Sequence, residues 1–305
     1  MKKVLVLMST YNGQKYLKAQ IESILNQQGV SVNILARDDV STDETLEILK
    51  HYHETQSNFD YYSGRENLKS AKSFIELLIR CNKEYDYFAF ADQDDVWDKD
   101  KLSIAVDKLS QYTDPAVYCS NARLVDKNLN SLNTLEYNYI PNFNFKRILI
   151  AGEIQGATML MNHQLIKLFS NIEMPEYIPM HDYFVSLICA GIGGKIIFDK
   201  EPHIKYRQHD NNVLGVDYSL KGKIKRNLCR FTKKSNFLDL EIMCQELLAQ
   251  QDFTLLPENI TFLRLGAEYK KNLMSKVKFG MLKGVDFGKI NLNIGYRLAV
   301  ILGKL

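Results

Sequence analysis

The sequence lacks several features that would each define a class of protein. In its 305 residues there is no apolar run of about 18 or more, so no membrane-spanning helix is predicted. Only 6 residues are proline and 46% are hydrophobic, which excludes collagen-like and disordered chains. The 5 cysteines are scattered without a CxxC pair, so we expect reduced, mostly buried thiols instead of a disulfide framework or a zinc site. The phosphate-binding patterns GxxxxGK[ST] and GxGxxG are also absent.

The near balance of charge, +3 overall, conceals an asymmetry. Residues 1–218 carry 23 basic and 29 acidic side chains, whereas residues 219–305 carry 16 basic and 7 acidic ones. Seven of the basic residues fall within 14 positions, with Ile224, Leu228 and Phe231 at helical spacing among them: Lys221, Lys223, Lys225, Arg226, Arg230, Lys233 and Lys234. This pattern favours contact with an anionic membrane surface. The alternative is an amphipathic helix packed on an acidic body, and nucleic-acid binding has less support because only Phe231 could stack on a base.

The N-terminus imitates a signal peptide only in part. Its apolar run, residues 4–8, is too short for the hydrophobic region of such a peptide and leads directly into polar turn residues. We therefore expect the protein to be cytoplasmic, and peripheral at the inner face of the cell membrane if the basic segment binds lipid.

The first 120 or so residues alternate between two hydrophobic periods. Short apolar runs predict strands at residues 4–8, 32–36, 59–62 and 87–91, and apolar positions at helical spacing follow each run. Alternating units of this kind predict the α/β class, with a doubly wound, mostly parallel sheet flanked by helices. The last 85 or so residues have a helical pattern, so we predict a body over 1–218 and a helical basic extension over 219–305.

Three polar segments follow predicted strands: STYNG, RDDVSTD and DQDDVW. Ligands of such sheets bind outside the carboxyl ends of the strands, so these segments are the candidate site. Asp38 and Asp39 could accept hydrogen bonds from a nucleobase or a ribose, or could cap the helix that begins near Thr42. The segment from Ser9 to Gly13 could also be a plain strand-to-helix turn.

The third segment brings Asp92, Asp94 and Asp95 together after an apolar strand. Three neighbouring carboxylates repel one another, and a divalent cation would offset that cost. A set of oxygen ligands with Asp-x-Asp spacing suits Mg²⁺ or Mn²⁺, which also bind substrate phosphates. The alternative is a solvated acidic loop that caps the next helix.

Taken in order, these segments resemble the N-terminal half of the family 2 glycosyltransferases, inverting nucleotide-sugar enzymes with the GT-A fold. The matching pieces are MSTYNGQKYLKAQIESIL, ARDDVSTDETLEIL, GRENLKSAKSFIELL and FADQDDVWDKDKL. Downstream, QGATMLMN, MHDYFVSLICA and YRQHDNNVLG look most like the bacterial rhamnosyltransferases, and the resemblance extends to about residue 215.

The resemblance implies a role for each matching residue. Asp92 and Asp94 would be the DXD motif that joins a divalent cation, Mg²⁺ or Mn²⁺, to the donor diphosphate, with His209 nearby. Asp182 would be the catalytic base, although its place before an apolar helix also suits a first-turn acid, and His209 alone would be an ordinary loop histidine. The residues implied to bind the nucleotide sugar are Thr10, Asn12, Asp38, Asp39, Arg65, Asp92 and Gln93.

Two positions depart from the family pattern. Val40 stands where the DDGS turn has glycine, and Lys69 stands where NLG has glycine. A valine puts in doubt the left-handed conformation of that turn. Neither position belongs to the DXD motif or the base, so we do not expect an inactive enzyme.

The resulting hypothesis is an inverting glycosyltransferase that moves L-rhamnose from dTDP-L-rhamnose to a saccharide or lipid-linked saccharide, in cell-surface polysaccharide synthesis. Two alternatives stay open. One is a haloacid-dehalogenase-like phosphatase, because DQDDV resembles its DxDx[TV] motif, although that class places the motif strand first. The other is a non-catalytic subunit that binds sugar nucleotides.

Overall fold

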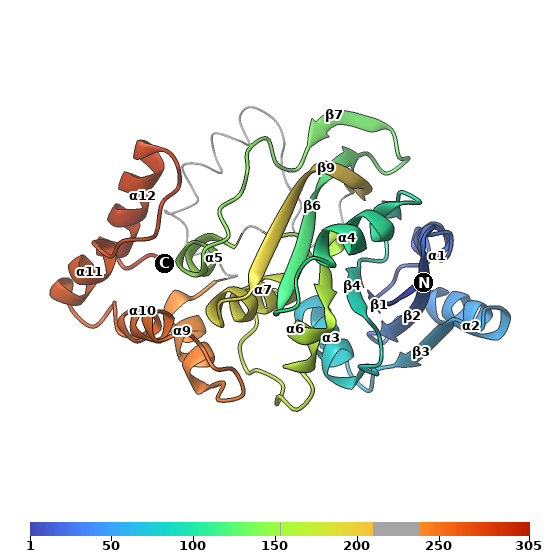
Figure 1. Ribbon diagram of the computed structural model, residues 1–305, viewed down its shortest axis with the longest axis horizontal. Helices are drawn as coiled ribbons and strands as arrows, with labels where there is room; N and C mark the ends of the chain where they lie inside the picture. The colour runs from blue at the N-terminus through green and yellow to red at the C-terminus, as the bar shows by residue number, and fades with distance from the viewer. Residues whose placement is uncertain (153, 210–237) are drawn as a thin grey trace.

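The computed structural model describes residues 1–152, 154–209 and 238–305 of the protein. Its central feature is a nine-stranded sheet with the order β3-β2-β1-β4-β8-β6-β9-β5, and β7 pairs with β6 outside this path (Figure 1). The strands are β1 (Lys2–Thr10), β2 (Val30–Asp38), β3 (Phe59–Ser63), β4 (Tyr87–Ala91), β5 (Val96–Trp97), β6 (Ala116–Val125), β7 (Ser131–Leu135), β8 (Leu160–Asn162) and β9 (Lys195–Arg207).

Helices connect and cover these strands. In the N-terminal half they are α1 (Leu17–Leu25), α2 (Thr45–Thr55), α3 (Lys69–Arg80) and α4 (Lys101–Leu109). The remaining helices are α5 (Phe145–Ala151), the 3₁₀ turn η1 (Gly156–Thr158), α6 (His163–Lys167), α7 (His181–Gly191), α9 (Leu240–Ala249), α10 (Pro257–Ala267), α11 (Leu273–Gly280) and α12 (Ile290–Ile301).

The sheet is parallel in its N-terminal part and mixed beyond it. β3, β2, β1 and β4 pair in parallel, while β8 is antiparallel to both β4 and β6. Chain order reverses between β1 and β4, because β2 lies on one side of β1 and β4 on the other. This switch point is where an open α/β sheet forms a ligand crevice. The predicted α/β class and doubly wound arrangement are confirmed, with a larger antiparallel share than expected.

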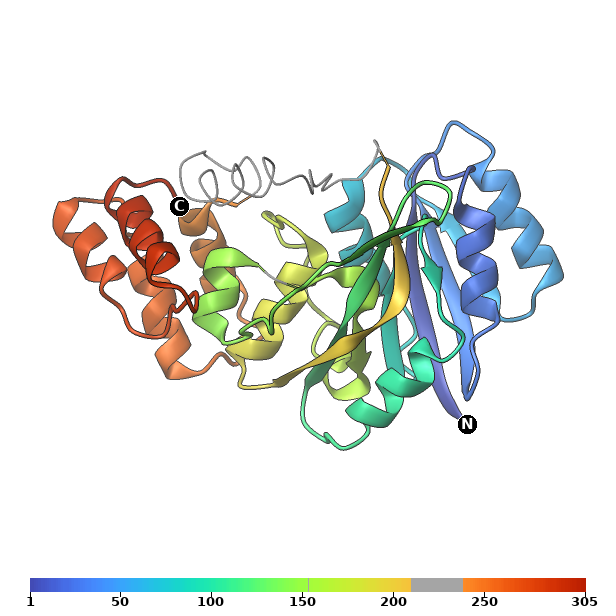
Figure 2. The same ribbon diagram turned by 90° about the horizontal axis from the view of Figure 1, so that it is seen from above.

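Alternating side chains of β1 enter two separate cores. Val4, Val6 and Met8 pack with α1, α2 and α4, whereas Leu5 and Leu7 pack with α3 and α7 on the opposite face. A strand buried on both faces has the continuous apolar pattern seen here. Figure 2 shows the sheet between the blue helices α1 and α2 on one side and α7 with the red C-terminal helices on the other.

The C-terminal helices belong to one of these cores. Leu240 and Met243 of α9 and Leu263 of α10 lie in the same buried cluster as Leu187 of α7. The predicted helical character of this region is therefore seen over residues 240–301. The basic segment 221–234 and the predicted boundary at residue 218 lie outside the described residues, so the two-domain division stays a prediction.

Two predictions about class can be checked within the described part of the chain. No helix there has both the length and the apolarity needed to cross a bilayer. Cys81, Cys119, Cys189 and Cys244 are free and buried, as expected for reduced thiols.

Candidate active site

The loops that follow β1 and β4 are joined by one side chain. The Gln93 carboxamide accepts a hydrogen bond from the Tyr11 backbone N–H and donates one to the Tyr11 carbonyl, both at 2.9 Å. Gly13 makes room for this pair, since a Cβ atom there would lie 2.2 Å from Gln93 Oε1. Gln93, which lies inside the predicted DXD motif, thus fixes the first loop against the acidic loop.

A second set of hydrogen bonds joins the first loop to the loop after β2. Buried Asp38 accepts from the Thr10 hydroxyl at 3.2 Å and from the Ser41 backbone N–H at 2.9 Å. Asn12 donates its backbone N–H to Ser41 Oγ and accepts from the Thr42 N–H. The structure therefore brings Thr10, Asn12 and Asp38 together, with Thr10 and Asp38 beneath the surface and Asn12 exposed at it.

Asp39 braces the start of α3. Its carboxylate is buried beside the Arg37 guanidinium and accepts the backbone N–H groups of Leu68 and Lys69, each at 2.8 Å. These are orphan donors of a helix N-terminus, and Leu68 has no side-chain cap of its own. Asp39 is thus a cap, as the alternative interpretation held, but for α3 and not for the helix near Thr42. Its Oδ2 atom still has capacity to accept another hydrogen bond.

The two positions that depart from the family pattern adopt the conformation that glycine would. Val40 has φ 65° and Lys69 has φ 62°. The doubt about a left-handed turn at Val40 was therefore misplaced, since the turn forms in spite of its β-branched side chain. Arg65, the remaining predicted nucleotide-binding residue, lies exposed on the segment between β3 and α3.

The carboxylates of the acidic loop after β4 interact with one another and with Asp182. Burial, together with the carboxylates of Asp94 and Asp182, raises the pKa of Asp92 to about 8. Asp94 Oδ2 lies 2.8 Å from His209 Nε2, and the imidazole packs against the Tyr16 ring with 5.1 Å between centroids. The structure thus brings together the predicted metal-binding side chains Asp94 and His209, with Asp92 within electrostatic reach of both Asp94 and Asp182.

Arg207, at the end of β9, holds the acidic loop to the sheet. Its backbone N–H donates to Asp95 Oδ1 at 3.0 Å, and its Nε donates to the Asp94 carbonyl at 2.6 Å. Its guanidinium also covers the Tyr16 ring at 4.3 Å. Arg207 was not among the predicted site residues, although it lies two residues before His209 in the YRQH segment that carries part of the resemblance.

Tyr206 is a second site residue that sequence analysis missed. The pKa of its hydroxyl is raised by burial and by the carboxylates of Asp92, Asp95 and Asp94. A phenol with a raised pKa stays protonated and can donate a hydrogen bond. The only available signal was its place beside Arg207 in the same segment.

Asp182 lies in the first turn of α7, at the same edge of the sheet. Its Oδ2 accepts the Gly156 N–H at 2.8 Å and its Oδ1 accepts the Tyr183 N–H at 2.7 Å. Each oxygen keeps a free lone pair, and the helix N-terminus favours the negative charge. Its neighbour His181 stacks on Phe74 with 3.9 Å between ring centroids, and burial lowers the pKa of His181 to about 4.

A divalent cation suits the acidic loop. Carboxylate oxygens and a neutral imidazole are ligands that Mg²⁺ or Mn²⁺ accepts, and buried Asp95 has one oxygen, Oδ2, without a hydrogen-bond partner. Within the described residues, the three-member acidic and histidine group whose ligand atoms all lie within 4.8 Å of one another is a different one: Asp98, Asp100 and His203. The predicted ligands Asp92, Asp94 and His209 do not form a group of this compactness. They therefore suit an ion that takes one or two protein ligands and completes its shell with phosphates and water.

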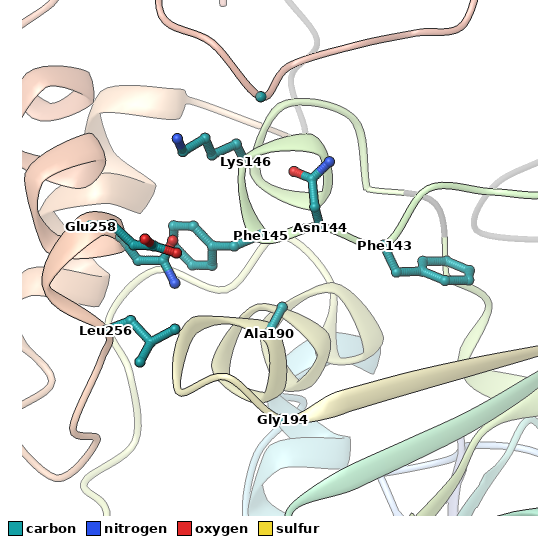
Figure 3. Close-up of a pocket in the computed structure, with 10 residues that line it drawn as sticks. Phe143, Asn144, Phe145, Lys146, Ala190, Gly194, Leu256 and Glu258 are labelled. Atoms are coloured by element: carbon teal, nitrogen blue, oxygen red, sulfur yellow. The ribbon is translucent and has the colours of Figure 1, made fainter.

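A separate pocket lies at the opposite end of α7. Figure 3 shows it between the start of α5 and the start of α10, with Lys146, Leu256 and Glu258 among its lining residues and a volume of about 460 Å³. Asp182 lies in the first turn of α7, whereas the pocket is lined by Ala190 in its last turn and by Gly194 just beyond it. The pocket is therefore not part of the site at the strand ends.

The fold and the polar loops at the carboxyl ends of its strands are those of a nucleotide-sugar transferase. The sequence comparison places the chain in this class. The profile of the family described as "Glycosyl transferase family 2" matches residues 5–169, and the chain belongs to this family. That match covers the β1, β2 and β4 loops described above.

One relative supports the family over most of the chain. The chain is 30% identical to the dTDP-rhamnosyl transferase RfbG of Shigella flexneri over 236 residues, which are 72% of this chain and 77% of that protein.

Solved structures confirm the GT-A fold. One is S. aureus TarS 1-349 in complex with UDP-GlcNAc, with TM-score 0.58, 17% identity, and coverage of 97% of this chain and 79% of that one. Another is the mannosyltransferase PcManGT of Pyrobaculum calidifontis in complex with GDP-Man and Mn²⁺, with TM-score 0.53, 14% identity, and coverage of 99% and 87%.

Proposed function

We propose that the protein is an inverting, metal-dependent glycosyltransferase that transfers L-rhamnose from dTDP-L-rhamnose to a hydroxyl of a saccharide or lipid-linked saccharide in cell-surface polysaccharide synthesis. The observation that carries the proposal is the proximity of Asp182 to the Asp92–Asp94 loop at the switch point of the sheet. The relation to RfbG supports the choice of donor.

In this proposal the first loop and the β2 loop receive the nucleotide. Asn12 and Arg65 are exposed at this edge, and Thr10, Asp38 and Asp39 hold the loops from below. Asp92 and Asp94, with His209 beside them, would hold Mg²⁺ or Mn²⁺. When bound, the cation would supply positive charge to stabilise the departing nucleoside diphosphate.

Asp182 would accept the proton of the acceptor hydroxyl. A carboxylate with a free lone pair on each oxygen can do so when the hydroxyl lies within hydrogen-bond reach. A single base with no second carboxylate acting as nucleophile gives one displacement, and one displacement inverts the anomeric centre. Tyr206, which is within electrostatic reach of the carboxylates of the acidic loop, would help orient negatively charged groups there by donating a hydrogen bond from its protonated hydroxyl.

The two alternatives lose support. Family membership and the two motif-bearing strands that precede the acidic strand argue against a phosphatase. A subunit that only binds sugar nucleotides would not need a proton acceptor such as Asp182 beside the acidic loop. The cytoplasmic, peripheral location remains part of the proposal.

The test is a panel of nucleotide sugars with Mn²⁺ or Mg²⁺, read by thermal shift and by product formation. We expect dTDP-L-rhamnose to stabilise the protein only with the cation present. Asp92→Asn and Asp182→Asn should each lower transfer by at least about 100-fold, the scale of a general base or an electrostatic stabiliser, while Asp182→Asn keeps donor binding. Asp98→Asn, in the other acidic group, is the matched control and should retain activity. Full activity in both site variants would overturn the proposal.

A further inference from the structure

The outer side of the last two helices is apolar and exposed. On α11, Leu273, Met274 and Met281 at its end are 65 to 77% exposed, and on α12, Ile290, Ile294 and Leu298 are 53 to 80% exposed. We call these six side chains the outer face. Monomeric proteins scatter exposed apolar residues singly, so such a concentration marks an interaction surface.

The outer face is not a poorly packed helix surface, because each helix also has a buried side. On α12, positions 290, 294 and 298 repeat every four residues and share one face, whereas Tyr296, Ala299 and Val300 are buried. On α11, Phe279 is buried against Phe262 and Tyr269, with ring centroids 5.1 and 5.4 Å apart. Both helices thus attach to the body by one side and present an apolar stripe on the other.

The charge around the outer face is predominantly positive. Residues 269–305 contain eight Lys and Arg residues and a single acid, Asp286. That acid is occupied locally, accepting from the Gly288 N–H and the Asn293 side chain at 2.8 Å. Five of the cations are exposed, and within the described residues no ion pair joins them to a carboxylate: Lys278, Lys283, Lys289, Arg297 and Lys304.

We propose that the outer face of α11 and α12 docks the protein on an anionic lipid surface. Helices of this kind lie in the membrane interface with the apolar side among acyl chains and the cations at the headgroups. Both helices lie together at one end of the molecule, where they can reach a surface at the same time (Figures 1 and 2). The inference rests on the peripheral location in the proposed function and deepens it, but the residues that carry it lie outside 221–234.

A second copy of the chain is a poorer occupant. An interface with two-fold symmetry places the same patch on both sides, so the cations of one copy would face those of the other. Like charges brought together in this way oppose association, whereas anionic headgroups attract them.

The first test compares vesicle binding of the full chain. With vesicles of phosphatidylcholine and phosphatidylglycerol, the double variant Ile294→Glu/Leu298→Glu should bind at least about tenfold more weakly than the native chain, because two inserted side chains become charged. Ile242→Glu is the matched control, since Ile242 is 45% exposed on α9, outside this face. The double variant should keep the native melting temperature and its donor-dependent activity on a soluble acceptor. Native binding by the double variant overturns the proposal.

The second test asks whether the face inserts. The native Trp97 is 3% exposed, so a tryptophan introduced by Leu298→Trp reports on its own surroundings. We expect its fluorescence to shift to the blue and to be quenched by brominated acyl chains. Vesicle binding without quenching, or a native dimer in light scattering that the double variant converts to monomer without loss of vesicle binding, would overturn the proposal.

Discussion

At the scale of single residues, Val40 shows how a local conflict is tolerated. A left-handed conformation costs an L-residue roughly 1–2 kcal/mol, and Val40 adopts it at φ 65° directly after the two buried aspartates Asp38 and Asp39. The Ser41 N–H donates to the Asp38 carboxylate and the Leu68 N–H donates to the Asp39 carboxylate, so hydrogen bonds define the turn from both sides. A turn fixed in this way keeps its shape whichever residue occupies its centre.

Val40→Gly should therefore raise the stability of the protein. Relief of strain exceeds the entropic cost of glycine, about 0.5–1 kcal/mol, so we expect a net gain of about 0.5–1 kcal/mol in the free energy of unfolding. Urea denaturation measures it. Val277→Gly is the control, because Val277 has a similar exposure, 37% against 40%, but lies in a helix where glycine is unfavourable. A loss of stability in Val40→Gly would contradict the strain argument.

Asp92 predicts a pH dependence of stability. In the folded protein its pKa is raised to about 8 by burial and by Asp94 and Asp182, whereas the unfolded chain ionises near the ordinary pKa of about 4. Between these values the folded state binds more protons, so the Asp92 contribution is present at about pH 4 and is lost as pH rises through about 8. In metal-free protein, the native chain should lose stability over this range more steeply than Asp92→Asn. Parallel curves of unfolding free energy against pH would count against it.

At the scale of elements, the sequence predicted the parallel half of the sheet well. Four apolar runs became β1 to β4, because strands buried on both faces carry their signal in consecutive residues. The structure extends β1 and β2 into polar residues as far as Thr10 and Asp38, which no hydrophobic pattern could show. The roles of Gln93 and Arg207 also escaped, since their partners lie 82 and 113 residues away along the chain.

The link between the β1 and β4 loops can be tested by a double-mutant cycle. Gly13→Ala places a methyl group where Gln93 Oε1 now lies, and Gln93→Ala removes the same hydrogen bonds from the other side. Each change should weaken donor binding by about 5- to 20-fold, the equivalent of about 1–2 kcal/mol. The double variant should be no worse than the weaker single one, because both remove one interaction. Calorimetry measures donor affinity, and additive effects would show that the two residues act separately.

At the scale of the whole molecule, the C-terminal helices and the catalytic body are parts of one structure. Leu256 donates its backbone N–H to the Gly191 carbonyl at 2.9 Å, and Asn259 donates its side chain to the same carbonyl at 3.0 Å. The sequence showed a helical, basic tail but not its attachment, because these contacts depend on tertiary structure.

Removal of residues 238–305 should therefore destabilise the remaining body of the protein. It would expose apolar side chains of α5, α6 and α7 that are now buried in a shared cluster. We expect the truncated chain to be insoluble or to melt at least about 10 °C lower, as measured by circular dichroism, because several kcal/mol of burial are lost. Truncation after residue 269, which removes only α11 and α12, should have a smaller effect. A truncated chain with the native melting temperature would show that the tail is a separate domain.

Helix α7 runs from Asp182 at one end to the contacts of Gly191 with α10 at the other. Its 11 residues span about 16 Å, and its sides are buried along nearly the whole length. Because α7 is held at both ends, it fixes the spacing between Asp182, the proposed base, and α10, on which α11 packs through Phe262 and Phe279. With the outer face on a lipid surface, as proposed, this spacing would fix the distance between Asp182 and the membrane. It would select acceptors by how far their reactive hydroxyl extends from the membrane.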